Sequence, residues 1–192
     1  MWKKIFLIIG LTALLFAQVN AQSINLGPQL GFYKAQDADD GTYAGGVAMR
    51  LKFMSVLGVE ASISNRQERY AKGALTVRSW PVVMITGLIY PLPIVYGAMG
   101  FGWYNATFQY DHSMLPLFTD ETTQKVGWHF GGGVELPITT YLLLTGDFRY
   151  VFLNYNFKAI PGSGDLKSNF TAITVGILLE LWSPAKWSQE YN

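Results

Sequence analysis

Residues 111–113 of this chain, Asp111-His112-Ser113, contain the three side-chain types of a nucleophilic hydrolase triad. In such a triad the serine attacks, the histidine takes its proton and the carboxylate orients the histidine. The three groups come from separate segments, because consecutive side chains do not easily converge on one reacting atom. Asp120, Glu121 and Ser163 could in principle complete a site around His112 at the external rim. We therefore interpret residues 111–113 as a polar loop and predict no catalytic residues.

Side chains that bind metals are few in this sequence. It contains two histidines and no cysteine, so a transition-metal site, which needs several such ligands, is not expected. Asp37, Asp39 and Asp40 lack the twelve-residue spacing of a calcium-binding loop. We predict a solvated acidic loop here, no metal ion and no cofactor. The formal net charge of +1 without a basic patch gives no support to nucleic-acid binding.

The elements that must position the polar side chains are β-strands. Only 14% of the residues are charged, against roughly 25% in soluble domains. Beyond residue 21 we find no helical periodicity of useful length, but several stretches alternate between apolar and polar or small residues, as two-faced strands do. We predict eight strands, at about 24–35, 43–54, 57–68, 75–90, 94–109, 125–136, 141–156 and 170–182.

The connections between these strands alternate in length. Residues 37–42, 69–74, 110–124 and 158–167 form polar loops, whereas the turns near Ser55, Pro91 and Pro137 are tight. A transmembrane barrel has this asymmetry, because its periplasmic turns are short and its external loops are longer. A soluble sandwich has no reason to sort its loops in this way.

The two faces of each strand indicate which side meets the solvent. Within 43–54, Val47, Met49 and Leu51 lie on one face, and Arg50 and Lys52 lie on the other. Packing all the bulky apolar side chains inside a narrow eight-stranded barrel would be crowded. If they face lipid instead, small and charged residues fill the interior. The predicted fold is therefore all-β, an eight-stranded antiparallel up-and-down transmembrane β-barrel.

Charged side chains on the inner face form a balanced set. The predicted interior residues are Arg50, Lys52, Arg66, Arg78 and Arg149, with Glu60, Glu68, Glu135, Asp147 and Glu180. Arg50 and Glu60 should face each other across the turn near Ser55. Arg149 is expected to be a hub for Asp147, Glu60 or Glu135, and His129 to bond near Glu68 or Arg66. Paired charges of this kind predict a closed lumen; a charged constriction in an open pore is the alternative.

Aromatic residues near the strand ends predict two girdles at the membrane interfaces. The residues proposed for the external girdle are Phe32, Tyr33, Tyr43, Trp103, Tyr104, Phe108, Trp128, Tyr155 and Phe170. Those proposed for the periplasmic girdle are Phe53, Tyr90, Tyr96, Tyr141 and Trp182.

The first residues carry the signature of a secretory signal. Lys3 and Lys4 precede an apolar run, and Ala21 ends a small-residue cleavage site. The run is too short for a spanning helix, which needs roughly 20 residues. The predicted organisation is a cleaved signal peptide at 1–21, a barrel domain at 22–182 and a short periplasmic tail at 183–192.

Several segments resemble the OmpA-type outer-membrane β-barrel family of Gram-negative bacteria. They are GVEASISNRQE (58–68), GAMGFGWYNATFQYD (97–111), GWHFGGGVELPI (127–138) and GDFRYVFLNY (146–155). The resemblance implies a barrel in the outer membrane with both termini in the periplasm, in contact with outer-membrane lipid and lipopolysaccharide. It also implies insertion by the barrel assembly machinery, which reads a final strand ending in an aromatic residue. Here ITVGILLELW ends in Trp182, although residues 183–192 follow it.

The family is defined by its architecture, so it leaves the function open. We expect a monomeric, non-enzymatic protein with a structural or surface-interaction role through its external loops. A small low-conductance channel is the alternative. An outer-membrane lipid-modifying enzyme is a weaker one, because some such barrels use histidine with serine or a carboxylate near the external rim.

Overall fold

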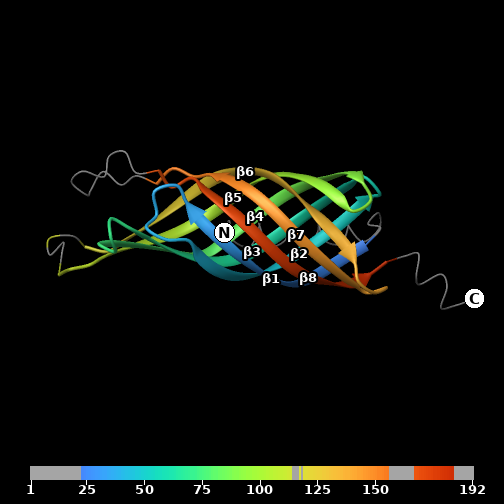
Figure 1. Ribbon diagram of the computed structural model, residues 1–192, viewed down its shortest axis with the longest axis horizontal. Helices are drawn as coiled ribbons and strands as arrows, with labels where there is room; N and C mark the ends of the chain where they lie inside the picture. Colours follow the sequence, from blue (N-terminus) through green and yellow to red (C-terminus); the bar gives the residue numbers. More distant parts are fainter. Residues whose placement is uncertain (1–22, 114–116, 118, 156–166, 184–192) are drawn as a thin grey trace, which may run out of the picture.

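The structure is a computed structural model that describes residues 23–113, 117, 119–155 and 167–183. The predicted signal peptide at 1–21 lies outside the described residues, as does the predicted tail beyond Ser183. Eight strands wrap around one axis (Figure 1). They are β1 (Ser23–Ala35), β2 (Thr42–Met54), β3 (Leu57–Tyr70), β4 (Leu75–Leu92), β5 (Val95–Tyr110), β6 (Glu121–Pro137), β7 (Leu142–Phe152) and β8 (Phe170–Trp182).

Each strand pairs antiparallel with its neighbours in the sequence, and β1 closes the sheet on β8, with Leu30 opposite Val175. The predicted eight-stranded antiparallel up-and-down barrel is therefore confirmed. Closure gives the backbone N–H and C=O groups of both terminal strands partners that lipid would not supply. Separately, no helix among the described residues is long and apolar enough to cross a membrane.

The strand bounds agree with the prediction to within a few residues, with two larger differences. β6 begins at Glu121 instead of residue 125, because the β5–β6 ladder continues as far as Phe108 opposite Glu121. β7 ends at Phe152 instead of residue 156. Short turns at 55–56, 93–94 and 138–141 occupy one end, which we call the turn end, and the longer connections occupy the other, the loop end.

The outer face of the barrel is apolar along most of its length. Leu30 is 72% exposed, Met99 70% and Ile177 52%, and similar side chains alternate outward on all eight strands. Large apolar side chains exposed in this density suit a wall in contact with acyl chains. The alternation that predicted a lipid-facing outer surface is present in the structure.

One irregularity in β4 corrects an interior assignment. Ser64 pairs with Val82 and Arg66 pairs with Ser79, so β4 carries an extra residue at Trp80-Pro81. A bulge of this kind reverses the alternation, because each residue beyond it points to the opposite face. Arg78, predicted to lie in the lumen, is consequently exposed on the outer wall.

Inward glycines allow the tilted strands and the bulky interior side chains to approach each other. A Cβ atom at Gly100 would lie 2.0 Å from the backbone oxygen of Ile85. No atom lies within 4 Å of a Cβ at Gly97, on the outward face of the same strand. The two positions therefore tolerate a side chain to very different degrees.

We expect Gly100→Ala to lower the free energy of unfolding by about 2 kcal/mol, because the backbone of β4 must shift. Gly97→Ala, the matched control, should change it by less than about 0.5 kcal/mol. Urea titration of the refolded protein, followed by the mobility difference between boiled and unboiled samples, measures both. Equal stability of the two variants would contradict the close approach of β4 and β5.

Candidate functional site

An ionic cluster fills the barrel interior toward the turn end. Its first centre is Arg50, which is fully buried on β2. Arg50 Nε donates to Glu60 Oε2 over 3.1 Å, and Nη1 donates to Glu135 Oε2 over 2.7 Å. Nη2 donates to the hydroxyl of Tyr96 over 3.0 Å. The predicted pairing of Arg50 with Glu60 across the β2–β3 turn is present, since the two residues are register partners.

Arg149 on β7 is the second centre of this cluster. Its Nη2 donates to Glu60 Oε1 and to Asp147 Oδ1, each over 2.7 Å. Its register partners are the small residues Gly131 and Ala172, which leave room for the guanidinium to cross the lumen. Arg149 is therefore the expected hub, and its partners are Asp147 and Glu60. Glu135, the third expected partner, is bonded to Arg50 instead. Glu60 thus joins strands β2, β3 and β7.

Lys52 and Tyr90 complete the cluster at the turn end. The ammonium of Lys52 bonds to Glu135 and lies 4.4 Å from the centroid of the Tyr90 ring. The Tyr90 hydroxyl donates to Glu135 Oε2 over 3.0 Å, and the side chain is 2% exposed. The prediction that Tyr90 belongs to the periplasmic girdle is wrong, because Tyr90 alternates regularly with the buried Thr86 and Leu88 and therefore shares their inward face.

His129 is buried in the same cluster. Its Nε2 lies 2.9 Å from the hydroxyl of Thr86, which also accepts a hydrogen bond from Arg149 Nη1 over 3.2 Å. The expected contact with Glu68 or Arg66 does not form. The strand tilt places His129 at the depth of the Arg149 cluster, a relation between distant strands that alternation along one strand does not contain.

Arg66 and Glu68 form a separate ion pair toward the loop end. Arg66 Nη2 donates to Glu68 Oε2 over 3.0 Å, and the hydroxyl of Tyr70 donates to the same oxygen over 3.1 Å. The guanidinium lies 3.7 Å from the centroid of Phe170. Among the described residues, Arg66 Nε, Arg66 Nη1 and Glu68 Oε1 have no hydrogen-bond partner.

An aromatic and aliphatic layer surrounds this ion pair and fills the lumen toward the loop end. It contains Tyr33, Tyr70, Leu75, Tyr104, Phe108, Tyr155 and Phe170, all buried. Five of these, Tyr33, Tyr104, Phe108, Tyr155 and Phe170, were predicted for the external girdle, and Tyr96 for the periplasmic one. Those predictions are wrong, because position near a strand end does not distinguish the two faces. Inward glycines, such as Gly102 and Gly127 beside the Tyr104 ring, make room for such side chains.

The other predicted girdle residues lie on the outer wall. Tyr43, Trp103, Trp128 and Tyr141 are exposed, and Phe53 and Trp182 are half-buried. Trp80, which is 62% exposed, was missed. The signal that would have found it is Pro81, because proline inside a strand marks a bulge or an edge.

Glu180 has interior parity but lies half-buried at the turn end, where its backbone N–H donates to Tyr141 O over 2.8 Å. With Arg78 outside and Glu180 at this rim, the buried set contains Arg50, Arg66 and Arg149, with Glu60, Glu68, Glu135 and Asp147, and half-buried Lys52. Four positive charges therefore balance four negative ones.

The Asp111–Ser113 segment forms a local turn. Asp111 Oδ1 accepts the backbone N–H of Ser113 over 2.9 Å and its hydroxyl over 2.6 Å. The hydrogen bond from the Ser113 hydroxyl lowers the pKa of the Asp111 carboxyl below its usual value. The serine thus donates to the carboxylate directly, whereas in a triad it donates to the histidine. No cluster of His, Cys, Asp or Glu suited to a metal ion occurs among the described residues.

Comparison with known proteins identifies the family. The model of the outer membrane protein beta-barrel domain matches residues 5–178. The chain belongs to this family. Membership implies the outer membrane of a Gram-negative bacterium as its location. No curated protein matches the chain.

Solved structures of other outer-membrane barrels share the fold of this family member. Neisserial surface protein A is 11% identical, with a TM-score of 0.56, and the match covers 84% of this chain and 99% of that one. OprG from Pseudomonas aeruginosa is 11% identical, with a TM-score of 0.56, covering 84% and 94%. Ail of Yersinia pestis is 14% identical, with a TM-score of 0.52, covering 84% and 99%. At this identity the likeness shows the fold alone.

We expect Arg149→Ala to lower the free energy of unfolding by about 3–5 kcal/mol, because it leaves Glu60 and Asp147 buried with fewer partners. Arg69→Ala is the control, since Arg69 pairs with Asp40 on the surface and such pairs contribute at most about 1 kcal/mol. Urea titration in detergent measures both. If the two variants unfold at the same concentration, the cluster does not stabilise the barrel.

Proposed function

We propose that this protein acts at the cell surface through its loop end, with a lumen that does not conduct ions. The observation that carries the proposal is the filling of the interior by two successive layers. The ionic cluster of Arg50 and Arg149 occupies the turn end, and the aromatic layer occupies the loop end. The cavity between them, beside Arg149 and Phe170, has a volume of about 10 Å³, which is at the lower limit for one water molecule.

Hydrogen bonds between the loops support a surface role. The carboxylate of Asp39 in the β1–β2 loop accepts the N–H groups of Lys72 and Gly73 in the β3–β4 loop, over 3.0 and 2.9 Å. Asp37 accepts the N–H of Lys167, in the connection that leads to β8, over 2.7 Å. The acidic loop thus links three connections. A surface ordered before binding loses less entropy when a partner docks.

Two relatives by fold have surface roles in their names. Ail is called the attachment invasion locus protein and has been crystallised with a heparin analogue, and another relative is Neisserial surface protein A. These names describe those proteins. They support a surface role for this protein only as examples of functions that occur with this fold. We propose no catalytic role for residues 111–113.

A low-conductance channel is the second candidate. The unpartnered atoms of Arg66 and Glu68 favour it, because buried polar atoms without protein partners are commonly bonded to water. A water path would have to pass both layers of the lumen.

The barrel closes within a single chain, so we propose that the protein is a monomer. Its last strand, which ends at Trp182, is the segment that the barrel assembly machinery would read. The chain enters β1 and leaves β8 at the turn end of the barrel. We propose that this end faces the periplasm.

The closed-lumen proposal predicts no steady conductance steps when the refolded barrel is added to a planar bilayer, because the buried ion pairs and aromatic rings leave no path for ions. A larger open porin, refolded in the same way, is the positive control. Folding is verified first by the mobility difference between boiled and unboiled protein. Steady, ion-dependent steps would replace the proposal with the channel candidate.

The proposed orientation predicts which residues are accessible on intact cells. The chain has no cysteine, so single-cysteine variants report one site each. A membrane-impermeant maleimide should label His112→Cys at the loop end and leave Ser55→Cys at the turn end unlabelled. Both should be labelled after the cells are broken. Labelling of Ser55→Cys alone on intact cells would reverse the orientation.

A further inference from the structure

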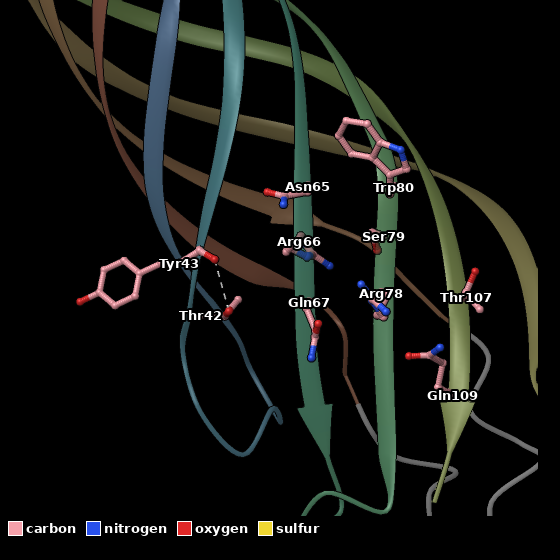
Figure 2. A pocket seen from close by; sticks show the side chains of 10 residues that line it. All are labelled: Thr42, Tyr43, Asn65, Arg66, Gln67, Arg78, Ser79, Trp80, Thr107 and Gln109. Carbon is pink, nitrogen blue, oxygen red and sulfur yellow. Dashed lines mark hydrogen bonds between the residues drawn. The ribbon is translucent and has the colours of Figure 1, made fainter.

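The outer wall of the barrel has a hollow between β2 and β3 at the loop end. The β2–β3 ladder ends at Gly46 opposite Ser64, whereas the β3–β4 ladder continues to Tyr70 opposite Leu75. Figure 2 shows β2 separating from β3 beyond this point. The hollow has a volume of about 780 Å³. Where the β2–β3 ladder stops, the side-chain oxygen of Asn65 accepts the N–H of Gly45 over 3.0 Å. This side-chain hydrogen bond takes the place of the next backbone bond of the ladder.

Polar side chains line this hollow on the membrane-facing wall. Gln67, Arg78 and Thr107 are register neighbours across β3, β4 and β5 and lie side by side in Figure 2. Thr42 and Gln109 border the same space. None of the lining residues carries a carboxylate. The lining therefore combines hydrogen-bond donors with positive charge, and suits an anion.

The depth of the hollow is indicated by two aromatic side chains. Tyr43 is 85% exposed and Trp80 62%, and such side chains mark the head-group level of a membrane. Along β4, Arg78 lies on the loop side of Trp80 (Figure 2). Its guanidinium is thus placed just outside the acyl region, where lipid phosphates lie.

The guanidinium of Arg78 forms no hydrogen bond or ion pair with the described residues, in contrast to those of Arg50, Arg66 and Arg149, which are all paired. Arg66 borders the hollow from the interior but is neutralised by Glu68, so Arg78 carries the net charge. A guanidinium offers two parallel N–H groups to phosphate oxygens, which a hydrated ammonium does not.

We propose that this hollow binds a phosphate group of lipid A, the membrane anchor of lipopolysaccharide in the outer leaflet. Arg78 binds the phosphate oxygens, and Gln67 and Thr107 donate further hydrogen bonds from the neighbouring strands. Lipid A is the source of the phosphate because the proposed orientation, on which this inference rests, places the loop end at the outer leaflet. Binding at this site does not depend on whether the lumen conducts. The site would hold one lipid beside the rim formed by the loops.

Native mass spectrometry of the barrel in a maltoside detergent tests the proposal with bisphosphorylated lipid A as the probe. The wild-type protein should retain one lipid A molecule, and Arg78→Gln should bind it about tenfold more weakly, as expected for the loss of a charged hydrogen-bond donor. Lys34→Gln is the matched control, because it removes an outward positive charge at the same end on β1. It should bind as the wild type does. The affinity of Arg78→Lys for lipid A should be intermediate, since lysine keeps the positive charge without the two parallel N–H groups of the guanidinium.

Three outcomes would overturn the proposal. Equal losses in Arg78→Gln and Lys34→Gln would mean non-specific attraction. Equal binding of dephosphorylated lipid A would mean that only acyl chains are held. Displacement of lipid A by millimolar inorganic phosphate would identify free phosphate as the ligand. Labelling of intact cells at Ser55→Cys instead of His112→Cys would exclude the outer-leaflet source independently, whereas conductance measurements would leave this site unaffected.

Discussion

The narrow closed cylinder is the constraint on which the rest of this structure depends. An eight-stranded barrel encloses a space just wide enough for side chains, and lipid surrounds it, so each charge inside must find its partner there. Glu60 satisfies this requirement for two guanidiniums at once, those of Arg50 and Arg149. Because a buried charge without a partner is strongly destabilising, the charges around Arg50 and Arg149 act as one unit, and Arg66 and Glu68 neutralise each other separately.

The same constraint explains why the lumen has two layers. Toward the turn end, Arg50, Glu135 and Tyr90 fill the cross-section with ion pairs and hydrogen bonds. Toward the loop end, rings such as Phe108 and Tyr155, 5.5 Å apart and edge to face, fill it with apolar surface. The polar inside and apolar outside of many transmembrane barrels are thus only partly present here. The interior is polar in one half and largely apolar in the other.

A filled interior leaves the two ends and the outer wall as the places where this protein can meet other molecules. At the loop end, Asp37 and Asp39 link three connections through backbone hydrogen bonds. On the wall just below, the early end of the β2–β3 ladder opens a polar hollow beside Arg78. The first feature lies in the loops. The second depends on the β4 bulge, because the bulge places Arg78 on the outer face.

The sequence by itself determined the strands, their order and the lipid-facing surface, because a period of two is a local property that each strand carries independently. It also determined the pairing of Arg50 with Glu60, since a tight turn fixes the register of its hairpin. Tertiary structure decided what local alternation does not contain. The extra residue at Trp80-Pro81 placed Arg78 on the outer face, opposite to that of Tyr90, and strand tilt brought His129 to Thr86 and Arg149 to Glu60 across the lumen. Contacts between distant strands depend on how the whole sheet closes, and the pattern of a single strand does not contain this information.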